Sequence, residues 1–192
     1  MSANGRDWRR SCIAVIGDAQ VKPDSQQEIL AYAVGKELVN AGYRLVTGGM
    51  GGVMEAAHRG ARDSINWYDG SGIGLLPGTD SAQANPFVDV AIPTGLDHGR
   101  NLVVAQSDAI IAIGGGAGTL SEMALAWIHR RLIIALRCGG WSERLANQRI
   151  DERIRYKELT EDRVFAADSA EEALRLLVDW LPRYTKRHVR IA

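Results

Sequence analysis

Short apolar runs alternate along the chain with longer segments in which apolar residues recur at helical spacing. The apolar runs are rich in Ile, Val, Leu and Ala and are bounded by Gly, Pro or Asp, which is typical of β-strands. Most of them are apolar at every position rather than at every second one, so we expect the strands to be buried on both faces. The predicted strands cover residues 12–16, 43–47, 72–76, 88–91, 109–113 and 132–136.

The segments between these runs predict helices. In the first, Ser25 is the expected N-cap, Glu28 completes a capping box, and Gly42 lies just beyond the predicted end. The last predicted helix is stopped by Pro182. The predicted helices cover residues 25–40, 52–62, 99–107, 118–130 and 170–180. The charged, weakly periodic segment 141–162 is expected to form a helix over a sheet edge or at a subunit contact.

The alternation of strands and helices predicts an α/β fold. We expect a single Rossmann-like domain over residues 1–192, in which a doubly wound parallel sheet carries helices on both faces. Its core is expected at about residues 12–137, followed by the C-terminal helix at about 170–180. In such sheets a ligand lies beyond the carboxyl ends of the strands, where the strand order reverses.

Composition narrows the range of partners. The chain carries 23 Lys and Arg against 23 Asp and Glu, so no global field would draw it to nucleic acid or to an anionic membrane. Its polar first residues and the short apolar run 12–16 predict neither a secretory signal nor a membrane span, which favours a cytoplasmic location. Cys12 and Cys138 are expected in or near the core, and their spacing does not suggest a metal site.

Two predicted strands end in glycine-rich loops that run into predicted helices. The loops are residues 48–52 (GGMGG) and residues 114–118 (GGGAG). Glycines let a ligand approach the backbone closely, and a helix start offers unpaired N–H groups and a positive dipole end. Each loop is therefore suited to hold an anion, although a tight turn uses glycine for structural reasons alone. Together with the loop that begins at Gly17, they are expected to line one crevice.

Several side chains near these loops are candidates for chemistry. Arg100 is placed to reach the same crevice, and its guanidinium is suited to phosphate. Thr119 and Glu122 have the spacing of a capping box, and from the residues alone capping is favoured over catalysis for Glu122. His98 is expected to be a partly exposed loop residue, and His58 to lie at the surface or at an interface.

Residues 115–122 (GGAGTLSE) resemble the PGGxGTxxE motif of the Lonely Guy superfamily, whose founding members are cytokinin-activating phosphoribohydrolases. Residues 47–54 (TGGMGGVM) resemble the first glycine loop of that superfamily. The chain departs from the hydrolases in three places: Gly114 replaces the motif's proline, and in the MxxRK motif Asp97 replaces methionine and Asn101 replaces lysine. With these departures the pattern is similar to the subgroup that contains molybdenum cofactor carrier proteins.

The resemblance implies a binding or carrier protein for a phosphorylated, nucleotide-like ligand, with molybdenum cofactor (molybdopterin) as the first candidate. No further cofactor would be required, and no protein metal ligands are implied, because the metal would arrive held by the pterin. The expected ligand-binding residues are Gly17, Asp18, Thr47, Gly48, Gly49, Met50, Gly51, Gly52, Arg100, Asn101, Gly114, Gly115, Gly116, Ala117, Gly118 and Thr119.

Two other functions remain open. One is a phosphoribohydrolase that releases the base from AMP or from a cytokinin riboside monophosphate, with Arg100 and Glu122 as its catalytic residues. The other is an interaction domain that senses a nucleotide. A lysine decarboxylase with a pyridoxal phosphate Schiff base is not expected, since neither glycine motif contains lysine. The resemblance also implies a homodimer, with a tetramer as an alternative.

Overall fold

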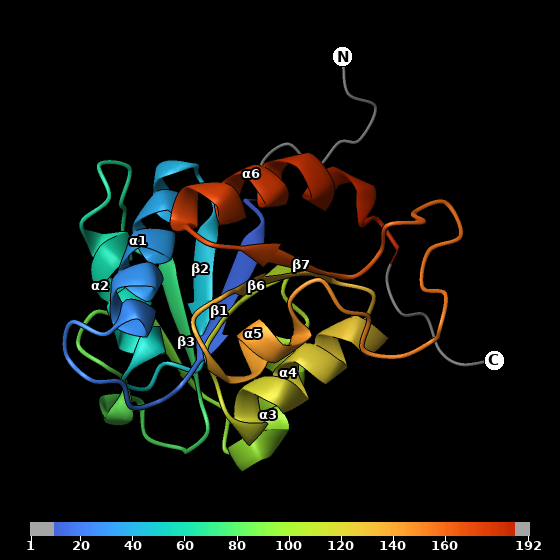
Figure 1. Ribbon diagram of the computed structural model, residues 1–192. Coiled ribbons are helices and arrows are strands. Elements are labelled where there is room, and N and C mark those ends of the chain that lie inside the picture. Colours follow the sequence, from blue (N-terminus) through green and yellow to red (C-terminus); the bar gives the residue numbers. More distant parts are fainter. Residues whose placement is uncertain (1–9, 187–192) are drawn as a thin grey trace.

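Residues 10–186 are described by the computed structural model, in which a parallel sheet is covered by helices on both faces (Figure 1). The strands are β1 (Cys12–Gly17), β2 (Arg44–Thr47), β3 (Gly72–Leu76), β4 (Val90–Pro93), β5 (Ala109–Ile113), β6 (Leu132–Leu136) and β7 (Val164–Ala167). The helices are α1 (Gln26–Asn40), α2 (Val53–Arg62), α3 (Arg100–Val104), α4 (Ala117–Ile128), α5 (Gly140–Leu145) and α6 (Ala170–Trp180).

The strand order is β4-β3-β2-β1-β5-β6-β7, and every neighbouring pair is parallel. The order reverses at β1, which pairs with β2 on one side and with β5 on the other. The predicted Rossmann-like, doubly wound α/β fold is therefore confirmed. Its crevice lies between the carboxyl ends of β1 and β5.

The central strands are buried on both faces, as their uninterrupted apolar sequences predict. In β5, Ile111 and Ile113 belong to one core, whereas Ile110 and Ala112 belong to the other. Successive side chains of a strand point to opposite faces, so one continuous apolar run supplies both cores. The first core is covered by α1, α2 and α6, and the second by α3 and α4.

The start of α1 follows the sequence prediction. Ser25 is the N-cap, and its Oγ accepts a hydrogen bond from the main-chain N of Glu28 at 3.4 Å. The Glu28 carboxylate in turn accepts from the main-chain N of Asp24 at 2.7 Å, one residue before the cap. The N–H group of Glu28 in the first turn is thus paired by the cap, and the Glu28 side chain ties the residue before the cap to the helix.

Two of the predicted elements, β4 and α3, differ most from their predicted boundaries. β4 begins at Val90 rather than at residue 88, because the main-chain N of Val88 still belongs to a turn and donates to the carbonyl of Asn85 at 3.2 Å. α3 ends at Val104 rather than at residue 107. There the main-chain N of Ser107 donates three residues back, to the Val104 carbonyl at 3.1 Å, which closes the helix with a tighter turn.

The prediction of a helix over residues 141–162 was wrong. α5 ends at Leu145, and Asn147 then adopts a left-handed conformation with φ of 60°, which turns the chain out of the helix. The main-chain N of Asn147 donates to the carbonyl of Val164 at 2.8 Å, so the segment folds back beside β7. β7 itself was not predicted, because its four residues make a short apolar run after a charged stretch.

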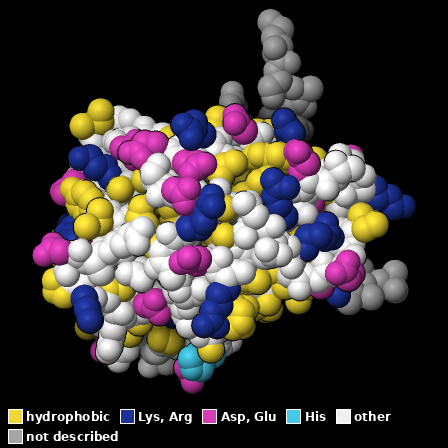
Figure 2. Space-filling view, in the orientation of Figure 1, with side chains coloured by type: hydrophobic (Ala, Val, Ile, Leu, Met, Phe, Trp, Pro, Cys, Tyr) yellow, Lys and Arg dark blue, Asp and Glu magenta, His cyan; other side chains and the backbone are white. Residues whose placement is uncertain are grey.

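Charged side chains of both signs are interspersed over the face shown in Figure 2, in keeping with the balanced composition. Within residues 10–186, no helix has the length and apolar character that a membrane span requires. The cytoplasmic location stays a prediction.

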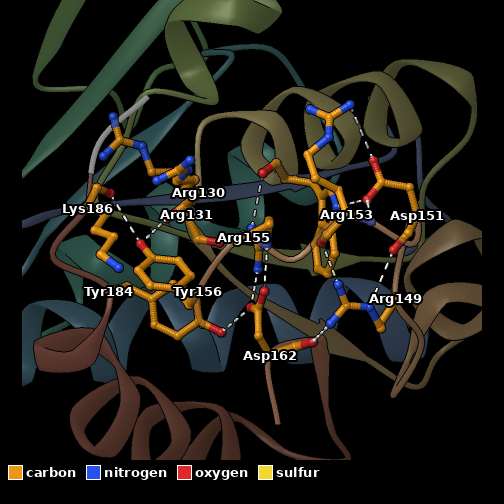
Figure 3. A network of polar contacts seen from close by, with 11 residues as sticks. Arg130, Arg131, Arg149, Asp151, Arg153, Arg155, Tyr156, Asp162, Tyr184 and Lys186 are labelled. Atoms are coloured by element: carbon orange, nitrogen blue, oxygen red, sulfur yellow. Dashed lines mark hydrogen bonds and ion pairs between the residues drawn. The ribbon is translucent and has the colours of Figure 1, made fainter. Parts of the chain in front are cut away.

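A buried polar network fastens the segment after α5 to the rest of the molecule (Figure 3). Arg155 and Asp162 form an ion pair with both side chains 1% exposed, and Arg155 Nε donates to Asp162 Oδ2 at 2.9 Å. The Arg155 guanidinium also lies 3.5 Å from the ring centre of Trp127 on α4 and donates to the carbonyl of Arg131 at 3.0 Å. The hydroxyl of Tyr184 donates to Asp162 at 2.7 Å. This segment, which lacks regular structure, is therefore held by paired charges rather than by apolar packing alone.

Replacing Arg155→Ala is expected to lower the free energy of unfolding by about 3–5 kcal/mol, because Asp162 would be left buried without its cation. Urea unfolding followed by circular dichroism measures this. Arg153→Ala is the matched control: its side chain is 63% exposed, and the change should stay within about 0.5 kcal/mol. Equal stability of the Arg155→Ala and Arg153→Ala proteins would contradict the assignment of the network.

Candidate functional site

A cavity of about 250 Å³ lies at the carboxyl ends of the central strands, where the strand order reverses. The three loops that the sequence placed at one crevice do meet there. The cavity is lined by Ile16, Gly17, Asp18, Ala19, Gly48, Met54, His98, Arg100, Asn101, Gly116, Gly118, Thr119 and Glu122.

Asp18 joins the loops around the cavity. Its carboxylate Oδ2 accepts a hydrogen bond from the main-chain N of Gly115 at 2.8 Å, and its carbonyl accepts from the main-chain N of Val53 at 2.9 Å. One residue after β1 thus holds both the second glycine loop and the first residue of α2. A carboxylate is a strong acceptor for backbone N–H groups, so the spacing between the loops is well fixed.

The second glycine loop packs against α5 and is hydrogen-bonded to it. Gly114 and Gly115 have φ of 64° and 97°, a backbone that favours glycine. Ser142 Oγ accepts from the main-chain N of Gly114 at 2.8 Å and donates to the carbonyl of Leu136 at 2.6 Å. Gly140 lies so close to this loop that a Cβ there would overlap the backbone of Gly114 and Gly115. Sequence reasoning missed Ser142, because its role depends on contacts far along the chain.

α4 begins at the cavity without a side-chain cap. Its N-cap is Gly116, and the first main-chain bond runs from the N of Leu120 to the carbonyl of Gly116 at 3.0 Å. The N–H groups of residues 117–119 therefore have no acceptor within the helix. Thr119 and Glu122 do not form the predicted capping box, since Thr119 lies inside the first turn and Glu122 in the second. The helix start is left to attract an anion.

Glu122 and Arg100 face each other in the cavity. Their side chains are only 8% and 13% exposed, and Arg100 Nη1 lies 3.7 Å from Glu122 Oε1. Burial raises the pKa of Glu122 to about 7, against the opposing effect of the Arg100 charge. Burial also lowers the pKa of Arg100, while Glu122 acts in the opposite direction. Within residues 10–186, Arg100 Nη1 has no hydrogen-bond acceptor.

Of the first glycine loop, residues 48–52, the residue that lines the cavity is Gly48. A Cβ at Gly48 would overlap the guanidinium of Arg100, so glycine at this position makes room for that side chain. The remaining glycines of the loop pack closely against protein; a Cβ at Gly49 would lie 2.7 Å from Leu76 Cδ2. The predicted site residues that do not line the cavity are Thr47, Gly49, Met50, Gly51, Gly52, Gly114, Gly115 and Ala117.

The buried side chain of Thr47 stabilises the first glycine loop. Its Oγ1 accepts from the main-chain N of Gly49 at 2.8 Å and lies 2.9 Å from His58 Nε2. His58 is fully buried rather than at the surface, and burial lowers its pKa to about 3, with a further contribution from Arg62. The imidazole is therefore neutral at physiological pH. Asn85 supports the outer side of the loop by donating to the carbonyl of Met50 at 2.9 Å.

Four cavity residues were absent from the predicted site. Ile16 and Ala19 flank the predicted Gly17 and Asp18, so extending that loop by one residue at each end would have found them. Met54 lines the cavity although it is only 6% exposed. His98 stands at the rim with a side chain that is 90% exposed, and no pattern in the sequence distinguishes it from an ordinary loop histidine.

The cavity combines a buried guanidinium, the unpaired N–H groups of a helix start, and the carboxylates of Asp18 and Glu122. This arrangement suits a ligand that presents an anionic group to Arg100 and hydrogen-bond donors to the carboxylates. Within residues 10–186, no group of three or more His, Cys, Asp or Glu side chains is arranged to hold a metal ion.

Residues 10–174 match the SLOG cluster4 family. Among curated proteins, the cytokinin riboside 5'-monophosphate phosphoribohydrolase LOG of Oryza sativa is 30% identical over 191 residues, covering 92% of this chain and 76% of that protein. Among solved structures, the molybdenum cofactor binding protein of Rippkaea orientalis superposes with a TM-score of 0.72 at 33% identity, covering 90% of this chain and 98% of that one.

A molybdenum cofactor carrier protein of Chlamydomonas reinhardtii is also similar in structure. It superposes with a TM-score of 0.70 at 28% identity and covers 91% of this chain and 99% of that one. The chain is thus similar in sequence to phosphoribohydrolases and in structure to proteins that bind or carry molybdenum cofactor.

Proposed function

The chain belongs to the SLOG cluster4 family, and from that premise we propose that it binds a phosphorylated, nucleotide-like ligand, with molybdenum cofactor as its cargo. The observation that carries this proposal is the buried Arg100 guanidinium, whose Nη1 lacks an acceptor in the described chain and which shares its cavity with the start of α4. The guanidinium and the helix start each favour an anionic group, so together they favour a phosphate in this cavity.

The choice of molybdenum cofactor as cargo is supported by the structural neighbours. They are a molybdenum cofactor binding protein and a molybdenum cofactor carrier protein, and the superposition includes nearly all of their chains. The phosphate of the pterin would pair with Arg100, and Asn101 and Thr119 would offer neutral hydrogen-bonding groups at the cavity wall. The metal is held by the pterin in such a complex, so the protein need supply no ligand to it.

Titration of the chain with molybdenum cofactor is expected to give saturable binding. Arg100→Ala should weaken that binding at least about tenfold, because it removes a charged hydrogen-bond donor from a buried site. Equilibrium dialysis measures the affinity, with the pterin quantified after oxidation to its fluorescent form. Arg175→Ala, an exposed arginine on α6, is the matched control and should bind like the wild type. Wild-type affinity in the Arg100→Ala protein would overturn the assignment of the site.

A second candidate function is hydrolysis of the N-glycosidic bond in a nucleoside 5'-monophosphate. The observation that favours it is Glu122, a buried carboxylate whose pKa is raised to about 7 and which faces Arg100 at 3.7 Å. Positive charge develops on the sugar when the base departs, and an ionised Glu122 would stabilise it or orient the attacking water. The similarity to the rice phosphoribohydrolase supports the same function.

Release of adenine from AMP, followed by chromatography, tests this second function. Turnover should rise with pH through about 7, because Glu122 acts in its ionised form, and it should be lost in Glu122→Gln. Glu171→Gln, which changes an exposed carboxylate on α6, serves as the matched control. If the folded wild-type protein releases no adenine, or if the Glu122→Gln protein keeps full turnover, the hydrolase reading fails.

We further infer that the chain forms a homodimer through the outer surface of α3 and α4. Leu102 and Val103 on α3 are 44% and 40% exposed, and Ile128 at the end of α4 is 40% exposed. Exposed large apolar side chains on two neighbouring helices are candidates for a contact surface. These helices also flank the cavity, so a partner seated there would lie beside the ligand.

Light scattering should therefore give a mass of two chains for the wild-type protein, and a mass of one chain for Val103→Asp. A buried charge at a dimer contact is unfavourable unless it is paired. Val178→Asp, at an exposed apolar position on α6, is the control and should leave the dimer intact. A wild-type protein with the mass of a single chain at micromolar concentration would contradict the inference.

A further inference from the structure

The charged groups of the cavity are unequally paired. The Asp18 carboxylate is engaged by the main-chain N–H of Gly115 at 2.8 Å. Glu122 and Arg100, by contrast, are 3.7 Å apart at their nearest atoms, which is longer than a hydrogen bond, and Arg100 Nη1 has no acceptor in the described chain. The guanidinium of Arg100 thus lies near the Glu122 carboxylate, but its Nη1 does not form a hydrogen bond with it.

An anion that reaches Arg100 must also approach Glu122. Two negative groups would then share one cation beside largely buried side chains, and like charges in such a place repel strongly. The repulsion disappears if Glu122 becomes a neutral acid. An ionised Glu122 competes with the ligand for Arg100, whereas the O–H group of protonated Glu122 donates a second hydrogen bond to the ligand.

The other charged and titratable groups that face Glu122 do not relieve this conflict. Asp18, from the loop after β1, is a carboxylate and adds negative charge. His98, from the turn before α3, has a side chain that is 90% exposed, so solvent screens any interaction with Glu122. From α3, Arg100 is the cation already shared. Glu122 is therefore the group whose protonation removes the conflict, and burial has already raised its pKa to about 7, so the proton is available near neutral pH.

We propose that the cavity binds a phosphomonoester together with one proton, which Glu122 takes up as the phosphate reaches Arg100. The step makes one O–H bond on the Glu122 carboxylate, with the proton drawn from solvent when the ligand arrives as a dianion, and no bond of the ligand breaks. The inference rests on the proposed binding function and adds to it that loading and release depend on pH. Affinity decreases as pH rises, because Glu122 must be protonated in the complex.

Calorimetry with ribose 5-phosphate tests the coupling. In two buffers of different ionisation enthalpy at pH 8, the wild-type protein should take up about one proton per ligand bound. With a pKa of about 7, the protonated fraction of Glu122 decreases about fivefold from pH 7 to 8 and about tenfold from pH 8 to 9, and the affinity should decrease with it. In Glu122→Gln the affinity should be flat over this range, with no proton taken up.

His98→Asn removes the histidine that lines the cavity, and proton uptake should persist in it. Binding without proton uptake in the wild type, or uptake that persists in Glu122→Gln, would overturn the inference. The wild-type measurement decides the matter alone if that variant does not fold.

The two proposals fail in different ways. If ribose 5-phosphate binds without a proton, the coupling is refuted while phosphate binding stands. If ribose 5-phosphate does not bind at any pH but molybdenum cofactor does, the coupling to a phosphomonoester falls and the carrier function remains. If neither ligand binds, both proposals fall.

Discussion

The hydrogen bond from the main-chain N of Gly115 to the Asp18 carboxylate is the contact on which the site depends. At the reversal of strand order, the chain after β1 and the chain after β5 lead to helices on opposite faces of the sheet, so they diverge and leave a gap. Asp18 spans that gap with its side chain and holds the start of α2 with its carbonyl. The cavity is the space that remains once these two loops are fixed relative to each other.

Inside that space the protein keeps polar groups incompletely paired, which is costly for stability. A buried guanidinium and a buried carboxylate usually gain most from close, bidentate contact, yet Arg100 and Glu122 are held just beyond hydrogen-bond distance. Gly48 contributes to this arrangement, because the guanidinium lies where a larger residue would place its side chain. The same incompleteness makes the cavity receptive to an anionic ligand, since Arg100 Nη1 still lacks an acceptor beside Glu122.

Much of the fold followed from local features of the sequence. Apolar runs that end at glycine gave the central strands, and the Ser25 and Glu28 pair gave the start of α1. The meeting of the three loops followed from the general rule for parallel sheets. β7 and the loop before it could not be predicted, because that segment is held by the long-range pair of Arg155 and Asp162 rather than by its own periodicity.

The lining of the cavity was predicted in outline and missed in detail for the same reason. Glu122 looked like a capping residue because capping depends only on spacing, whereas α4 starts at Ala117, so that Glu122 lies in its second turn and faces Arg100. His58 looked like a surface residue, since nothing local shows that Thr47 lies against it. Which glycines line a cavity and which pack against protein is likewise decided by neighbours distant in the chain.

Gly114 limits how this chain can change. Its φ of 64° is far from the angle near −65° that a proline ring imposes, and its N–H, which proline lacks, is bound to Ser142. The proline found at this position in the related PGGxGTxxE motif therefore cannot enter the loop as a single replacement. It would have to arrive together with a new loop conformation and a change at Ser142. The loop with glycine at this position and the loop with proline thus differ by several coordinated substitutions. A protein that has one of these loops is not easily converted to the other by single mutations.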